Sequence, residues 1–322
     1  GNVVRYGASD MYDPNDLALI LVTAVPLTLA DAFSAPTWAK PVWLAALGLL
    51  CISIFKTASR GGLVGLVVEG LIFLFMRTPP ISFARKAILT GLAGLIVVVS
   101  SPDQMLNRMQ TLFQGEDYNL QVEGEVSSAP GRIQIWETAI SAIDGRILLF
   151  GVGVGQFPTM LGARFGQYFY MTAHNTPLQA FIEMGALGGL IFLGLLFTIW
   201  NNNRVAHHKL RSATQNGLIV QLPMFLNLSL VGYLVCSLLL DKKYSSLIPL
   251  FLACSMAIRS IATRHELEGE ALHLTDKRGA TVGHGTVHQS RLHWLVAVGT
   301  GFDGLSRFAK NAGGVDPKKD SA

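Results

Sequence analysis

Long apolar runs alternate with short polar connections along most of this chain, and that pattern predicts membrane-spanning helices. A spanning helix needs about 20 mostly apolar residues, within a range of roughly 17–25. Seven runs approach this length, and the second, third, fourth and seventh are short enough that we expect them to extend into flanking polar residues. The runs cover residues 17–34, 41–56, 62–76, 86–100, 178–200, 217–240 and 244–258.

The sequence therefore predicts an all-α, polytopic membrane protein with about seven transmembrane helices. The connections 77–86 and 201–216 and the tail after residue 258 carry Lys and Arg, which favour the cytoplasmic side of a membrane. The large loop 101–177 then lies outside the membrane on the periplasmic side. We expect two domains: residues 1–258 in the membrane, and residues 259–322 as a polar, partly disordered cytoplasmic tail.

Composition supports the membrane interpretation and disfavours other classes. Apolar residues make up 50% of the chain and charged residues 14%, whereas soluble domains carry roughly 25% charged residues. This balance disfavours a soluble enzyme, a disordered chain or a nucleic-acid binder. The three cysteines lie inside apolar runs and the tail histidines are irregularly spaced, so we expect no disulfide framework, metal site or cofactor. Because the chain begins at Gly1 without Met, we expect that an N-terminal part is missing.

Three blocks on the predicted periplasmic side carry candidate chemistry. The first is Thr57-Ala-Ser-Arg60-Gly-Gly, in the turn between two apolar runs. Arg60 begins a predicted helix there, against the general bias of basic residues toward the cytoplasm, which makes it a functional candidate. The alternative is an arginine whose side chain merely reaches out of the membrane to the interface.

The second block is Gly131-Arg132-Ile-Gln-Ile-Trp136, followed by a glycine run over residues 151–157. Arg132 and Trp136 are one turn apart on the same face of a predicted amphipathic helix near residues 131–144. The glycine run suggests a phosphate cradle, but it lacks the G-x-G-x-x-G spacing and the strand–turn–helix context of such sites. A turn after a short helix is the favoured interpretation.

The third block runs from His174-Asn-Thr-Pro177 to Glu183 and the glycines that follow. Pro177 is tolerated in the first turn of a helix, so His174 lies just before the chain enters the membrane. A neutral imidazole there suits proton transfer near neutral pH, although a histidine that only caps the helix is the alternative. Glu183 lies a little inside the bilayer, where an acid usually faces a partner or a water-filled cavity.

Taken together, the blocks T-x-S-R-G, G-R-x-x-x-W with G-x-G-x-G-x-F, and H-N-x-x-L-x-x-x-x-E-x-G-x-x-G resemble the core of the bacterial O-antigen ligase and Wzy-type polymerase superfamily. The resemblance extends over roughly residues 1–258. It implies His174, Arg132 and Arg60 as catalytic residues, with Arg60, Arg132, Glu183 and Trp136 as substrate-binding residues.

The resemblance also implies a glycosyltransferase of lipopolysaccharide biosynthesis, working at the periplasmic face of the inner membrane without a cofactor. Its donor would be a glycan on undecaprenyl diphosphate. Its acceptor would be lipid A–core for a ligase, another lipid-linked glycan for a polymerase, or a hydroxyl of a protein for an O-oligosaccharyltransferase. We expect a ligase. A secondary transporter and an inactive scaffold are the alternatives from other classes. A transporter would be expected to have a repeated half and paired charges at mid-membrane, and the sequence shows neither.

Overall fold

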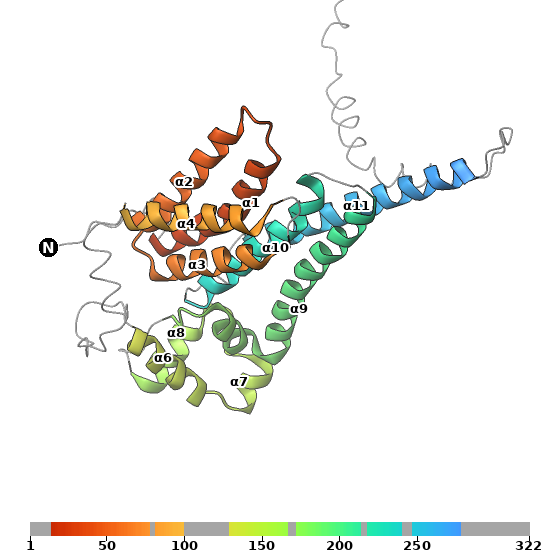
Figure 1. Ribbon diagram of the computed structural model, residues 1–322. Coiled ribbons are helices and arrows are strands. Elements are labelled where there is room, and N and C mark those ends of the chain that lie inside the picture. Colours follow the sequence, from red (N-terminus) through yellow and green to blue (C-terminus); the bar gives the residue numbers. More distant parts are fainter. Residues whose placement is uncertain are drawn as a thin grey trace, which may run out of the picture. The chain divides into compact units, whose positions relative to one another are not determined.

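The computed structural model describes residues 14–77, 81–99, 129–166, 172–213, 218–239 and 247–277, and every regular element in these ranges is an α-helix (Figure 1). The chain divides into two compact units, residues 1–269 and 270–322, and the account below concerns the first. The helices are α1 (Pro14–Ser34), α2 (Lys40–Lys56), α3 (Arg60–Phe75), α4 (Phe83–Val99), α6 (Ala129–Ser141), α7 (Gly145–Phe150), α8 (Phe157–Phe165), α9 (Thr176–Ala213), α10 (Leu218–Ser237) and α11 (Leu247–Lys277).

Each of the seven predicted runs is helical in the structure, as α1 to α4 and α9 to α11. Among the described residues, four helices are both long and apolar enough to cross a membrane. These candidate spans are Pro14–Ser34, Thr176–Ser212, Ile219–Ser237 and Leu247–Leu267. Helices α2, α3 and α4 have 17, 16 and 17 residues, at the short end of what a bilayer requires. A multi-pass membrane protein is therefore supported, and the count of seven spans stays a prediction.

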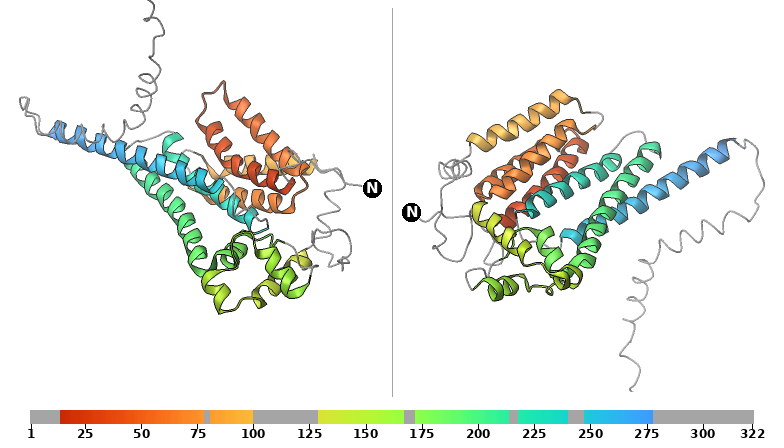
Figure 2. Two further views of the ribbon diagram at one scale, coloured as in Figure 1. Left: turned by 180° about the vertical axis from the view of Figure 1, so that it is seen from behind. Right: turned by 90° about the horizontal axis from the view of Figure 1, so that it is seen from below.

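Helix α1 packs against α2, α3 and α10, and α4 lies against the outer side of α2 and α3 (Figure 2). Small residues let these helices approach closely. A Cβ at Gly62 of α3 would lie 2.6 Å from the Cβ of Ala18 in α1, and one at Gly65 would lie 2.7 Å from the Sγ of Cys236 in α10. Since lipid tails are as apolar as leucine, such close contact is a main source of helix association in membranes.

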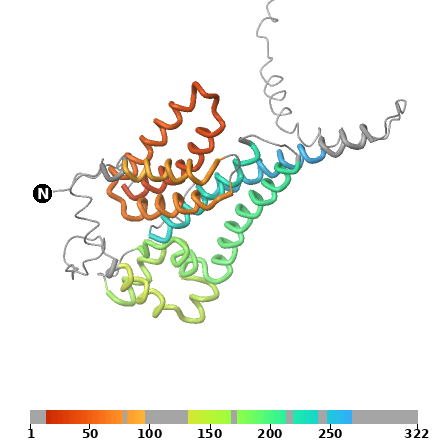
Figure 3. The backbone as a smooth tube through the Cα atoms, viewed as in Figure 1, coloured from red at the N-terminus to blue at the C-terminus, as the bar shows by residue number. Residues whose placement is uncertain are grey.

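A second, smaller core holds α6, α7 and α8 against the first turns of α9. Its buried residues are Ile135, Ala139, Ile147, Phe157, Leu161, Ala173 and Ile182. The helix predicted near residues 131–144 is confirmed as α6. Figure 3 follows the backbone from α6 through the two short helices toward α9.

Asp144 caps the start of α7 and joins this helix to α8. Its Oδ1 accepts a hydrogen bond from the Ile147 amide at 2.8 Å, which caps the helix, and its Oδ2 pairs with Arg164 of α8 at 2.8 Å. The amide of Ile147 and the guanidinium of Arg164 hold the pKa of the Asp144 carboxyl below its usual range. The polar end of α7 is therefore fixed by a charged pair at the surface.

Helix α11 continues to Lys277, well past residue 258, where we predicted the last span to end and the tail to begin. The helix extends because apolar positions continue at helical spacing, and both Ile258 and Ala262 are buried in the main core. The predictions for residues 1–13, for 101–128 of the large loop and for the tail after residue 277 lie outside the described residues.

Candidate functional site

Helix α9 is broken at Gly185, near its start. This residue has φ 68° and ψ −175°, far from helical values. Side chains disfavour a positive φ, and a Cβ here would lie 2.4 Å from the carbonyl oxygen of Leu149 in α7. Glycine is therefore required both by the backbone conformation and by the close approach of α7.

The glycine run fits into this break. The amides of Val152 and Gly153 donate to the carbonyls of Ile182 and Glu183, each at 3.0 Å. In an uninterrupted helix those carbonyls would accept from amides four residues further on. Gly151 follows α7 as its C-terminal cap, which confirms the predicted turn after a short helix. The backbone of this loop is thus paired with α9.

Glu183 holds the rest of the loop. Its side chain is 1% exposed, and its Oε2 accepts from the Gly155 amide at 2.7 Å. Its Oε1 accepts from the amide of Phe157, the first residue of α8, at 3.4 Å, and from the Nε2 of Gln179 at 2.9 Å. A carboxylate at a helix N-terminus also interacts favourably with the helix dipole. The carboxylate of Glu183 is therefore engaged by the protein's own donors.

Gln179 and Trp136 extend this network to the segment before His174. The Oε1 of Gln179 accepts from the Ala173 amide at 3.2 Å. The indole Nε1 of Trp136, in α6, donates to the Ala173 carbonyl at 2.7 Å. Both backbone groups of Ala173 are thus held, one from α9 and one from α6. We call Trp136, Ala173, Gln179 and Glu183 the positioning network.

His174 directly follows this network. It has φ 46°, a left-handed conformation that is uncommon for residues other than glycine. Its ring is partly buried, with Nε2 3.4 Å from the Oγ1 of Thr172. The Oδ1 of Asn175 accepts from the Leu178 amide at 3.0 Å, as a helix cap does. Asn175 therefore caps the start of α9. The role of His174, as a base or as a structural residue, stays a prediction.

The two arginines lie at the starts of their helices, as predicted. Arg132 is in the first turn of α6, one turn before Trp136, and is partly buried. Arg60 is the first residue of α3, where Ser59 is the cap and its Oγ accepts from the Gly62 amide at 3.2 Å. The network links the helix of Arg132 to the segment of His174. The convergence of Arg60 on these two residues stays a prediction.

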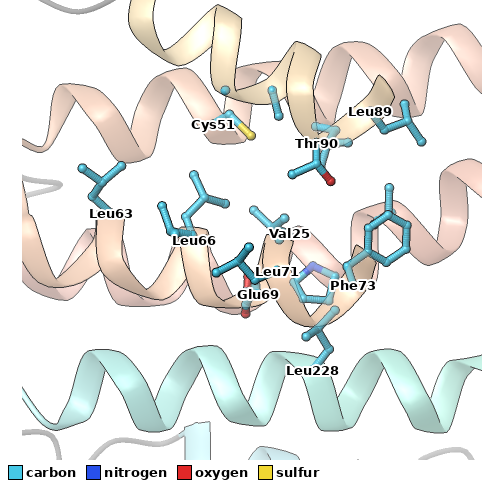
Figure 4. Close-up of a pocket in the computed structure, with 17 residues that line it drawn as sticks. Val25, Cys51, Leu63, Leu66, Glu69, Leu71, Phe73, Leu89, Thr90 and Leu228 are labelled. Carbon is cyan, nitrogen blue, oxygen red and sulfur yellow. The ribbon is translucent and has the colours of Figure 1, made fainter. Parts of the chain in front are cut away.

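An apolar cavity of about 210 Å³ lies among α1, α2, α3, α4 and α10 (Figure 4). Glu69, 2% exposed, is the charged residue in its lining, and neither carboxylate oxygen has a hydrogen-bond partner among the described residues. The described lining contains no Lys, Arg or His. Such a cavity does not fit a diphosphate, which arginine or lysine would have to hold.

Sequence reasoning missed Gln179, Asn175 and the break at Gly185. A signal for Gln179 was available, because it lies four residues before Glu183 and therefore on the same face of the helix. Asn175 also has the residue type and the position of a helix cap. The break had no local signal, since glycines are common within membrane helices.

Comparison with known families agrees with the three sequence blocks. The family model described as O-antigen ligase matches residues 45–193. This range contains Arg60, Arg132, the glycine loop, His174 and Glu183, and hence the whole positioning network. The comparison with curated proteins found no match. Over residues 45–193, the chain carries a domain of the O-antigen ligase-related superfamily.

Proposed function

We propose that this protein transfers a glycan from an undecaprenyl-diphosphate carrier to an acceptor hydroxyl, as an O-antigen ligase does. The observation that carries the proposal is the positioning network, which ties the second and third sequence blocks into one hydrogen-bonded unit. The match to the O-antigen ligase family supports the same type of reaction. We place the reaction at the periplasmic face of the inner membrane, from the distribution of Lys and Arg.

His174 is the proposed general base. Its ring would take the proton of the acceptor hydroxyl while that oxygen attacks the anomeric carbon of the donor sugar. The bond between the sugar and the diphosphate breaks, and the bonding pair leaves with the diphosphate. A base of this kind contributes typically about 10²–10⁴-fold to the rate.

Arg60 and Arg132 are the proposed partners of the leaving diphosphate. A guanidinium stays charged and can hold two phosphate oxygens at once, so it stabilises negative charge as that charge develops. Stabilisation of this type amounts to several kcal/mol per site in enzymes. The donor is already activated by its diphosphate, so this scheme uses no nucleotide and no cofactor.

Glu183 and Trp136 receive a different role from the one that the sequence suggested. We expected both to bind substrate, yet the Glu183 carboxylate is buried and the indole N–H of Trp136 is bonded to Ala173. We propose that both are positioning residues that hold the glycine loop and the segment of His174 in place.

The nature of the acceptor separates ligase from polymerase and from protein glycosylation. In the strain that carries this gene, deletion should abolish lipid A-linked polymer while undecaprenyl-linked polymer accumulates. Loss of long chains, with single repeats still attached to lipid A, would instead indicate a polymerase. Unchanged lipid A-linked glycan together with unglycosylated periplasmic protein would indicate an O-oligosaccharyltransferase.

The reaction itself is tested with purified protein. Full-length protein in vesicles, given an undecaprenyl-diphosphate glycan and lipid A–core, should form the linked product and release undecaprenyl diphosphate. Movement of the donor across the vesicle membrane without formation of product would favour the transporter alternative and overturn the proposal.

A further inference from the structure

The C-terminal end of α7 exposes a cluster of apolar side chains. Leu148, Leu149 and Phe150 are 54%, 60% and 77% exposed, and Val154 in the glycine loop is 60% exposed. We call these four residues the α7 tip. Contiguous exposed apolar residues of this kind mark a contact with a partner or with a membrane.

The α7 tip lies beside a candidate membrane span. The Leu149 carbonyl lies against Gly185, and the Val152 amide is bonded to Ile182, so the tip is level with the first turns of α9. Within the two turns that follow Gly185, α9 exposes Leu187, Leu190 and Ile191 at 69%, 62% and 63%. At a rise of about 1.5 Å per residue, these residues follow within about 10 Å of Gly185 along the axis.

The two ends of α7 have opposite character. Its N-terminal end carries the surface pair Asp144–Arg164 and the exposed Arg146, while its C-terminal end carries the apolar tip. A short helix with one charged end and one apolar end suits the boundary between water and hydrocarbon. We propose that the α7 tip inserts into the hydrocarbon of the bilayer beside α9, so that part of residues 101–177 is embedded and not wholly outside.

Lipid fits this cluster better than a protein partner does. A stable protein interface uses roughly 20–30 residues on each side. The α7 tip has four, and it continues directly into the exposed apolar side chains of a span. Acyl chains cover both surfaces without any further partner.

The proposal is tested with nitroxide labels on the full chain in vesicles, after Cys51, Cys236 and Cys254 are replaced by serine. Three single-cysteine variants are labelled. Phe150→Cys reports on the α7 tip, Leu190→Cys is the reference for a position in lipid, and Glu137→Cys is the reference for a position in water. Oxygen collects in the hydrocarbon, whereas a charged nickel chelate stays in water. We expect Phe150→Cys to match Leu190→Cys, with high oxygen and low nickel accessibility.

Two results would overturn the proposal. Nickel accessibility at Phe150→Cys equal to that at Glu137→Cys would place the tip in water. Low accessibility to both probes would show that protein covers it. Neither measurement requires transferase activity, so the outcome is independent of the proposed reaction.

Discussion

His174 occupies a left-handed backbone conformation at the residue before the helix cap, and this decides how its role is best tested. Alanine would change the chemistry and also strain the backbone. Asparagine visits this conformation more readily than most residues and retains a polar side chain. We therefore expect His174→Asn to fold normally, yet to lower the turnover number about 10²-fold or more, because it cannot act as a base.

Turnover of reconstituted protein and the amount of folded protein in the membrane check this prediction together. His208→Asn is the control, because His208 is an exposed histidine of α9, the helix that begins two residues after His174, and lies outside the positioning network. We expect the control to keep full turnover. Full activity of His174→Asn would remove the general base from the proposal.

A conservative substitution separates the two possible roles of Arg60 and Arg132, which are binding of the diphosphate and a side chain that only reaches the membrane interface. Lysine keeps the charge at position 60 or 132 but loses the bidentate geometry of the guanidinium. We expect Arg60→Lys and Arg132→Lys each to lower kcat/KM by about 10-fold or more, on the scale of one charge-assisted hydrogen bond. Steady-state kinetics with varied lipid-linked donor measure the effect. Arg211→Lys, at an exposed position near the end of α9, should leave kcat/KM unchanged.

If Arg60→Lys and Arg60→Ala both retained normal kinetics at normal protein levels, Arg60 would be an arginine that only reaches the membrane interface. The same outcome at Arg132 would separate α6 from the site. The two positions are tested singly, because the proposal requires each of them to contact the diphosphate.

At the scale of the element, the break in α9 is the feature on which the site depends. A Cβ at Gly185 would collide with the Leu149 carbonyl and would require a side chain at φ 68°. We expect Gly185→Ala to lower the free energy of unfolding by about 1–3 kcal/mol, the cost of such strain, and to reduce transfer. Thermal unfolding in detergent and the transfer assay measure both effects.

Gly194→Ala is the matched control on the same helix. Nothing lies within 4 Å of a Cβ at Gly194, and this residue has an ordinary helical backbone. Alanine there should stabilise the protein slightly, by about 0.4–1 kcal/mol, through the unfolded state. Equal effects of the two substitutions would show that the break at Gly185 is dispensable.

The elements also show which features could be predicted from sequence. The seven apolar runs and helix α6 were predictable, because apolar composition and helical periodicity are local properties of the chain. For the same reason Arg60 and Arg132 were placed correctly in the first turn of a helix, and His174 just before one. The role of Glu183 was not predictable, because its partners Gly155 and Phe157 lie more than 25 residues earlier in the chain. A buried acid looks the same in sequence whether it meets a ligand or a backbone amide.

At the scale of the whole molecule, the orientation in the membrane is the prediction on which the reaction rests. We expect Glu137→Cys to lie on the periplasmic side and Ser212→Cys in the cytoplasm, since Lys and Arg are concentrated in the connection next to Ser212. Both positions are exposed. In spheroplasts of a strain whose protein lacks the native cysteines, an impermeant maleimide should label position 137 and not position 212.

Permeabilised cells are the control, because both cysteines should then react. Labelling of Ser212→Cys alone in intact spheroplasts would invert the orientation. His174 would then lie on the cytoplasmic side, and the proposed transfer in the periplasm would have to be abandoned.

The pairing of the glycine loop with α9 has a consequence for how the site can be monitored. The amides of Val152 and Gly153 donate hydrogen bonds to carbonyls of α9, although Gly153 itself is exposed. Amide hydrogens of an exposed loop exchange rapidly with solvent, whereas these two can exchange only when the loop separates from the break in α9. The exchange rates of these two amides therefore report how often the loop separates from α9. We expect both amides to be protected together, and to lose that protection together in Gly185→Ala.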